Sequence, residues 1–504
     1  MNFNLFYISP ELILAAGGIV VLVAGLWARR WTTPERLSIV SPEVLSILVL
    51  LGALVPSSMM LGRAWKGMLS VPQFGTQLTT AMIAVDGLAI FFKIIAILST
   101  AIVALLAIDY FRRIKFHRGE FYALLVFVTL AITSLAASTD LIMIYLSLEF
   151  LSITSYVLAG YLKQDPRSNE AAVKYFLYGS IAAAVMIYGM SMLYGVTGTT
   201  NILAIANKLR TGHADPALYP LLYLASLFVL VGFGFKISMV PFHQWAPDTY
   251  EGAPTPITAF LSVGSKAAGF AVLVRVLDMA LPPLVFDWAP LIIVLSGLTM
   301  TVGNLVAIPQ LNIKRMLAYS SIAQAGYILL GVAAMGVAAP QIKSSAIQAV
   351  LIYIFVYLFM NLGAFAVVTM LSARLGSDEI RNFAGLMKRS PFAAVAMVFF
   401  LLSLAGIPPT AGFLGKFYLF AAALQTGDAA VFWLTIVAIA NTVVSVYYYM
   451  NVARYMFFVE PMQSEPITAS RPLNFVIGLT LAMTLIVLLY PQPFIEMARI
   501  SSVF

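Results

Sequence analysis

A succession of long apolar segments with almost no charge inside them limits the folds open to this chain. A membrane-spanning helix needs about 20 mostly apolar residues. We find fourteen such segments, at 10–27, 40–60, 86–108, 120–138, 140–162, 171–195, 217–240, 254–280, 288–309, 316–337, 345–372, 391–425, 428–453 and 472–491. Between Tyr175 and Asn207 there is no charged residue at all. The pattern predicts an all-α polytopic membrane protein of about fourteen transmembrane helices.

Composition excludes the other classes of protein. Hydrophobic residues make up 61% of the 504 positions and charged residues only 10%, whereas soluble domains are about 25% charged. A chain of this length could not bury so much apolar surface in water. A transmembrane β-barrel is excluded because its strands would be short and would alternate in polarity.

The basic residues are distributed unevenly between the loops on the two sides of the membrane. Those after the odd-numbered helices hold 17 Lys and Arg residues, and those on the opposite side hold 6. Because basic loops stay in the cytoplasm, we expect both termini on the outer, periplasmic side of a bacterial inner membrane. The net charge of +8 then reflects cytoplasmic loops beside the lipid bilayer, and nucleic acid is not expected as a partner.

Redox chemistry is not expected from this chain itself. It has no cysteine, which excludes disulfides and thiolate-bound iron–sulfur clusters. Its three histidines, His117, His213 and His243, lie outside the middles of the apolar segments, so two facing haem ligands in the bilayer are not expected. We also expect no metal site.

Six basic side chains and one acid deep in a helix nevertheless fall inside the predicted helices. They are Glu149, Lys236, Lys266, Lys416, Lys93, Lys174 and Arg275. Ionisable residues at the bilayer centre are costly and are candidates for function. The first four lie deepest. The alternatives are a structural ion pair for Glu149 and lysines that extend to the surface, the interpretation favoured for Lys93 and Arg275 near helix ends.

The excess of lysine over acid suggests a proton relay. Burial favours the neutral form of a lysine, so three mid-membrane lysines with one carboxylate can exchange protons at working pH. Glu149 would control the relay by pairing with a nearby lysine. A membrane scaffold whose charges only hold helices together is the alternative.

An internal repeat accompanies these charges. Residues 120–280 and 288–458 each hold five predicted helices, between an N-terminal part at 1–110 and a last helix at 471–504. Because five is odd, the second set should lie inverted relative to the first. The fourth helix of each set is broken by proline, helix 7 near Lys236 and helix 12 near Lys416. Inverted repeats with broken helices are typical of secondary transporters, although Pro and Gly are common in membrane helices.

The charged residues lie in four distinctive segments: SLEFLSITSYVLAGYLKQDPRSNEAAVKYFLYGS, GFGFKISMVPFHQWAPDTYEGAPTPITAFLSVGSKAAGF, NIKRMLAYSSIAQAGY and AGIPPTAGFLGKF. These segments resemble the antiporter-like proton-translocating family. It includes three large membrane subunits of respiratory complex I, the NADH–quinone oxidoreductase, and subunits of multi-subunit cation/proton antiporters and membrane hydrogenases. Within it, the segment GYLKQDPRSNEAAVKYF and the lysine at 416 are most similar to the N-type subunits of the bacterial oxidoreductase.

The resemblance implies roles for matching residues. Glu149 would be the acid on helix 5, Lys236 its partner on helix 7, Lys266 the central relay lysine, and Lys416 the terminal lysine. Lys174 would modulate the Glu149–Lys236 pair. Partners would be other membrane subunits of complex I, including homologous antiporter-like subunits. NADH, FMN, iron–sulfur clusters and quinone would be bound by those other subunits. A sodium/proton antiporter or membrane hydrogenase subunit of the same family is the alternative.

Overall fold

The computed structural model describes residues 5–31, 41–68, 81–114, 119–211, 216–461 and 465–503. These residues form twenty α-helices and, apart from isolated bridges, no β-strand. The helices are α1 (Ser9–Trp31), α2 (Pro42–Trp65), α3 (Gly87–Ile114), α4 (Gly119–Ala137), α5 (Leu141–Ala159), α6 (Pro166–Thr197), α7 (Ile202–Arg210), α8 (Tyr219–Ile237), α9 (Trp245–Gly252), α10 (Thr255–Phe260), α11 (Lys266–Met279), α12 (Val285–Ala307), α13 (Ile313–Val337), α14 (Pro340–Leu375), α15 (Leu386–Arg389), α16 (Pro391–Ala405), α17 (Ala411–Gln425), α18 (Ala429–Phe458), α19 (Arg471–Leu489) and α20 (Gln492–Ser501).

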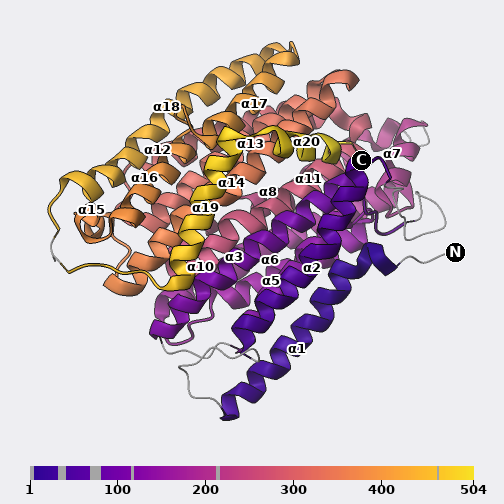
Figure 1. Ribbon diagram of the computed structural model, residues 1–504. Coiled ribbons are helices and arrows are strands. Elements are labelled where there is room, and N and C mark those ends of the chain that lie inside the picture. Colours follow the sequence, from indigo (N-terminus) through magenta and orange to yellow (C-terminus); the bar gives the residue numbers. More distant parts are fainter. Residues whose placement is uncertain are drawn as a thin grey trace.

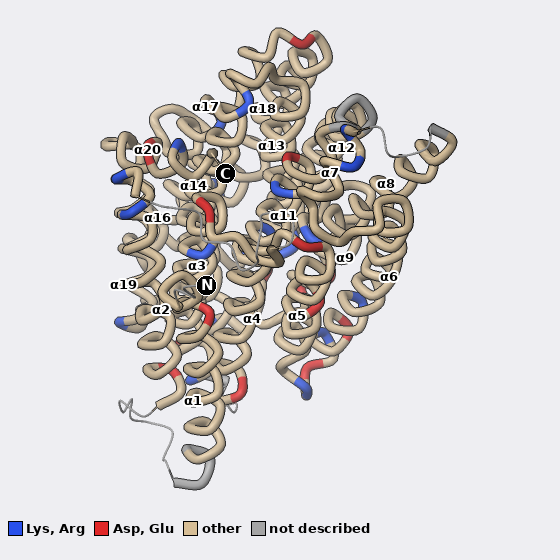
Figure 2. The backbone as a smooth tube through the Cα atoms, turned by 90° about the vertical axis from the view of Figure 1, so that its right-hand side faces the viewer, with Lys and Arg blue, Asp and Glu red and all other residues tan. Residues whose placement is uncertain are grey.

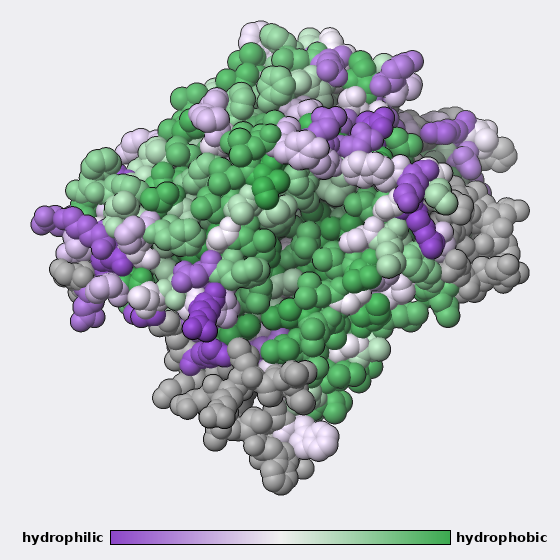
Figure 3. Space-filling view, viewed as in Figure 1, coloured by the Kyte–Doolittle hydropathy of each residue, from purple (hydrophilic) through white to green (hydrophobic). Residues whose placement is uncertain are grey.

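The expected membrane architecture is confirmed. Thirteen helical segments in the described residues are long and apolar enough to cross a bilayer. The predicted segment 391–425 instead forms two helices, α16 and α17, with a break between them, so this pair accounts for the fourteenth crossing. An apolar surface covers the middle of the molecule, and hydrophilic side chains gather toward opposite ends of the bundle (Figure 3).

Burial divides the bundle into a centre and a periphery. The apolar stretches of Thr255–Met279 and of α14 are entirely buried, whereas only 28% and 33% of those in the N-terminal helix and in α2 are buried. In Figure 1, α11 and α14 lie in the middle, with α1 along the lower edge and α18 along the upper edge. The central helix with Lys266 is interrupted by a π-helical segment, Leu261–Ser265, between α10 and α11, which the sequence did not predict.

The two predicted helix breaks have the same backbone geometry. Ser238 and Gly406 cap α8 and α16 in the left-handed conformation, with φ of 61° and 82°. Each lies three residues before a proline. In both, the next residue closes a six-residue turn: Met239 N–H donates to Gly234 O at 2.8 Å, and Ile407 N–H donates to Leu402 O at 3.1 Å. This is the Schellman type of helix end.

A second matched feature lies at the start of the second helix of each predicted set. Asp140, which caps α5, forms an antiparallel bridge with Asn201, and Asn312, which caps α13, forms one with Glu379. Each bridge joins the start of one helix to the chain that follows the next helix. The matched bridges and breaks agree with two related sets, and the inverted relation between the sets stays a prediction.

Candidate functional site

The three candidate relay lysines are all enclosed by the bundle. Lys236, Lys266 and Lys416 are 0%, 3% and 1% exposed. The alternative that Lys236 and Lys266 extend to the surface is therefore wrong for this structure. They come from α8, α11 and α17, so three helices far apart in sequence supply them.

Lys236 contacts α5 and α6. Its ammonium donates to Ser152 Oγ at 3.2 Å and to Tyr175 Oη at 3.4 Å. Ser152 lies one turn after Glu149 on α5. On α11, Gly269 lies against the stem of Lys236, where an added Cβ would meet Ile237 Cγ2 at 2.6 Å and Lys236 Cβ at 3.4 Å. This glycine therefore allows α11 to pack closely against α8.

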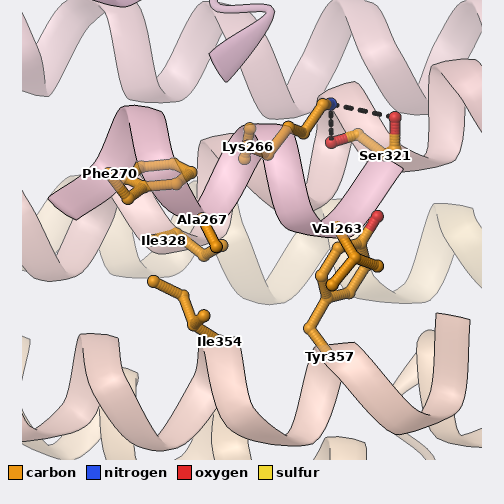
Figure 4. Close-up of a pocket in the computed structure, with 9 residues that line it drawn as sticks. Val263, Lys266, Ala267, Phe270, Ser321, Ile328, Ile354 and Tyr357 are labelled. Carbon is orange, nitrogen blue, oxygen red and sulfur yellow. Dashed lines mark hydrogen bonds between the residues drawn. The ribbon is translucent and has the colours of Figure 1, made fainter. Parts of the chain in front are cut away.

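Lys266 is the first residue after the π-helical segment. Its ammonium donates to Ser321 O at 2.8 Å and to Ser321 Oγ at 2.9 Å on α13 (Figure 4). The side chain borders a small cavity of about 10 Å³, lined by Val263, Lys266, Ala267, Phe270, Ser321, Ala325, Ile328, Ile354 and Tyr357. The hydroxyl of Tyr357 has no hydrogen-bond partner in the described residues. Buried polar groups of this kind commonly bind water.

Lys416 follows the second break. Its ammonium donates to Ala405 O at 2.9 Å, a carbonyl freed at the end of α16, and to Thr442 Oγ1 at 3.3 Å. It also lies 4.2 Å from the ring centroid of Tyr327. Lys236 precedes its break and Lys416 follows its own. The two lysines therefore occupy different positions relative to their breaks.

A buried polar network that we did not predict lies beside Lys416. Gln324 on α13 donates to Leu404 O at 2.9 Å and to Tyr449 Oη at 3.3 Å, and it accepts a hydrogen bond from Tyr353. Tyr449 also pairs with Ser320, the residue next to the Ser321 that holds Lys266. Neutral groups thus connect the surroundings of Lys266 to the broken end of α16. The sequence signal was the run YSSIAQAGY, whose serines and glutamine interrupt an apolar segment.

Glu149 lies at the side of the bundle. It is partly exposed on α5, among exposed apolar neighbours that include Leu146, Phe150 and Ile153. Its Oε1 has no hydrogen-bond partner in the described residues. A carboxylate on an apolar lipid-facing surface would be costly, so this arrangement favours a protein partner on that side.

Lys174 contacts other residues than those expected. Its ammonium binds Asp248 Oδ2 at 2.8 Å and Glu170 Oε1 at 2.7 Å, and its side chain is 38% exposed. No contact with Glu149 or Lys236 accompanies these two, so any modulation of that pair would act indirectly. The modulating role stays a prediction.

Two basic residues expected at the surface are buried in ion pairs, and that prediction was wrong. Arg275 is 0% exposed and donates to Asp86 Oδ2 at 2.7 Å and to Asp86 Oδ1 at 2.8 Å. Lys93 binds Glu11 at 2.9 Å. Both pairs fix α3 to neighbouring helices. The acids lie far away in sequence, which is why local position suggested the surface.

His243 lies between the first break and α9, and burial lowers its pKa, so its ring is neutral at pH 7. His117 and His213 lie outside the described residues. Among the residues that are described, no group of three or more His, Asp or Glu side chains is arranged to hold a metal ion.

Comparison with known proteins places the chain in a family. A family model described as NADH:quinone oxidoreductase/Mrp antiporter, transmembrane, matches residues 138–445. The chain is 42% identical to NADH-quinone oxidoreductase subunit N of Heliobacterium modesticaldum over 503 residues, covering 100% of this chain and 99% of the relative. It is 44% identical to subunit N of Moorella thermoacetica over 467 residues, covering 90% of this chain and 95% of that protein.

Solved structures share the fold. A chain of respiratory complex I from Thermus thermophilus is 30% identical with a TM-score of 0.77, covering 96% of this chain and 98% of its own. A chain of the Mrp complex from Dietzia sp. DQ12-45-1b is 21% identical with a TM-score of 0.83, covering 100% of this chain and 97% of its own. The sequence likeness and the shared fold together show that this chain belongs to the NADH:quinone oxidoreductase/Mrp antiporter family of transmembrane subunits.

Proposed function

We propose that this chain is the antiporter-like, proton-translocating N-type membrane subunit of an NADH–quinone oxidoreductase. The observation that carries the proposal is the set of three buried lysines, Lys236, Lys266 and Lys416, each bound to neutral oxygen atoms. The relatives named subunit N cover the whole chain, which supports the N-type assignment within the family.

The proposed relay runs from Glu149 through Lys236 and Lys266 to Lys416. A proton cannot cross about 30 Å of hydrocarbon unaided, so titratable groups joined by polar side chains and water are needed. Each lysine has carbonyl or hydroxyl oxygens for its charged form, but no carboxylate of the described residues in direct contact. Such a site stabilises the cation only partly, so the proton can leave. The network around Gln324 would join the last two lysines.

The proposal requires partners in the membrane. The redox reaction, with NADH, FMN, iron–sulfur clusters and quinone, would take place in other subunits of the complex, and this chain would couple it to proton movement. Glu149, partly exposed on an apolar face, supports a neighbouring membrane subunit on the α5 side, such as a homologous antiporter-like subunit. The basic loops support an inner-membrane location with both termini on the periplasmic side.

Substitution of Lys266 tests the relay. Arginine keeps the charge but does not release its proton, so Lys266→Arg should lose proton pumping while the complex assembles. Lys266→Met should lose the charge and pumping alike. Proton pumping into reconstituted vesicles, measured alongside NADH oxidation, distinguishes a proton relay from a structural scaffold. An arginine variant that pumps like the wild type, with a methionine variant that fails to assemble, would support a scaffold instead of a relay.

The second candidate is a subunit of a sodium/proton antiporter or membrane hydrogenase of the same family. The likeness in fold to the Mrp complex chain, with a TM-score of 0.83, and to a chain of the membrane-bound sulfane sulfur reductase, with 0.84, favours keeping it. Purification of the native complex separates the two candidates, because only the oxidoreductase would retain NADH-oxidising subunits.

A further inference from the structure

The short helix α9 is held by a cluster of ion pairs at one end of the bundle. Asp248 lies at the centre of this cluster: its Oδ2 binds Lys174 of α6 at 2.8 Å, and its Oδ1 binds Arg315 of α13 at 2.6 Å. Arg315 also binds Glu251 of α9 at 3.0 Å. Figure 2 shows α9 beside α6, with acidic and basic residues near it. One carboxylate therefore joins helices from the two predicted sets.

The start of α9 contacts the surroundings of Lys236. Trp245 lies one turn before Asp248, and its ring stacks on that of Tyr175 with centroids 4.2 Å apart and an interplanar angle of 11°. The Trp245 indole N–H donates to Phe235 O at 2.9 Å, a carbonyl in the last turn of α8. Tyr175 in turn accepts the hydrogen bond from Lys236. Trp245 thus supports both the hydroxyl that binds Lys236 and the helix that carries it.

Helix α9 needs such anchors. It has only eight residues and follows the break after α8, and helices this short are not stable by themselves. Asp248 is the one carboxylate among the described residues with ion pairs to both α6 and α13. Glu170 binds the same Lys174 but lies on α6 itself, four residues away, so it joins no second element.

We propose that Asp248 is a positioning residue, which anchors α9 to Lys174 and Arg315 so that Trp245 and Tyr175 hold Lys236 in place. The effect on proton transfer rests on the proposed function above, whereas the anchoring of α9 does not. The resemblance gave no role to Asp248 or Arg315. Lys174 then acts on Lys236 through α9.

The chain has no cysteine, so a single introduced thiol reports on α9. Thr249, next to Asp248, is fully buried, as is Ala246 on the same helix. Thr249→Cys should be protected from a water-soluble maleimide in membranes that hold the assembled complex, with labelling read on this chain after gel separation. Ala246→Cys serves as a second reporter if Thr249→Cys impairs assembly. Each reporter is combined with Asp248→Asn, Asp248→Ala, Asp248→Glu or Glu170→Gln.

Without the Asp248 ion pairs, α9 should separate transiently from the bundle more often and expose the introduced thiol. Two partly exposed ion pairs are lost in Asp248→Ala, which corresponds to about a 5- to 30-fold rise in labelling rate. Asp248→Asn should show a smaller rise in the same direction. Asp248→Glu keeps the carboxylate and should restore most of the protection. Glu170→Gln removes an acid from the same lysine and should leave labelling unchanged.

Pumping gives the second measurement. Asp248→Ala should lower proton pumping per NADH oxidised, and Asp248→Glu should recover it. Equal labelling in the wild type, Asp248→Ala and Glu170→Gln would overturn the anchoring role. Faster labelling with undiminished pumping would overturn the link to Lys236, provided that Lys236→Met itself abolishes pumping. If Lys236→Met also pumps normally, the proposed relay is wrong while the anchoring of α9 stands on the labelling result.

Discussion

Gly406→Ala should move Lys416 without removing any charge. Gly406 caps α16 with φ of 82°. A Cβ at this position would lie 2.8 Å from Lys416 Cδ and 3.3 Å from both Cε and Nζ. Because these atoms belong to a flexible side chain, the lysine and not the backbone would shift. Its hydrogen bond to Ala405 O, now 2.9 Å long, would be lost or lengthened.

Two contributions set the size of the effect. An alanine in the left-handed conformation costs roughly 1–2 kcal/mol, which lowers the stability of the subunit. A hydrogen bond from a charged donor contributes about 1.5–3 kcal/mol. If that bond fixes the lysine where protons are received, its loss lowers pumping about 10- to 100-fold, since each 1.36 kcal/mol is a factor of about ten.

Gly427→Ala separates the two contributions. Gly427 has φ of 70°, and nothing lies within 4 Å of a Cβ built there. It therefore carries a similar backbone cost without contact to Lys416. Both variants should assemble to the same extent on a blue-native gel. Proton pumping in vesicles should fall only in Gly406→Ala; equal pumping in both would refute the placement of Lys416 as a relay group at this break.

Three further predictions follow from the ion pairs and from Glu149. Asp86→Ala leaves Arg275 buried without its carboxylate, which should cost about 3–5 kcal/mol and reduce the subunit in membranes on immunoblots; a wild-type level would show that the pair is dispensable. Glu149→Ala should assemble normally, because the side chain is partly exposed without a direct ion pair, but should lower pumping; normal pumping would remove Glu149 from the relay. Burial raises the pKa of Asp248, but hydrogen bonds from Lys174 and Arg315 outweigh it and keep the pKa below 3.8. Its ion pairs then contribute fully above about pH 4 and are lost only as pH falls through that lowered pKa. The pumping defect of Asp248→Ala should therefore be the same from pH 6 to 8, and a defect that changes across this range would contradict a permanently ionised anchor.

The sequence was sufficient for the helices and the buried lysines. A membrane-spanning helix can be recognised from about 20 consecutive residues. A lysine such as Lys266 or Lys416 is recognised as buried because the residues next to it in the sequence are apolar. Boundaries were less accurate where polar residues extend a helix, as in α14, which runs from Pro340 to Leu375 against a predicted 345–372. Both breaks could be predicted in the same way, because the prolines and glycines near positions 241 and 409 lie within the broken segments themselves.

Partners of charged groups could not be predicted, because they depend on contacts between distant parts of the chain. Arg275 pairs with Asp86, 189 residues away, and Lys174 reaches Asp248 across 74 residues. A basic residue near a helix end has the same local pattern whether it extends to the surface or meets a buried acid. The sequence alone contained no signal to separate these cases.

The two helix breaks share one backbone geometry, but the charged residue that follows each break has a different role. Asp248 lies seven residues after Pro241, and Lys416 lies seven residues after Pro409. The matching helix ends at Ser238 and Gly406 make these positions equivalent along the chain. At the first, an acid is partly exposed and paired with two cations, so its charge is constant. At the second, a buried lysine has neutral acceptors alone within the described part of the chain, so its charge can change. A permanently paired group such as Asp248 is suited to anchoring a helix. A titratable group without an ion pair, such as Lys416, is suited to proton exchange. This difference agrees with the separate roles that we propose for the two residues.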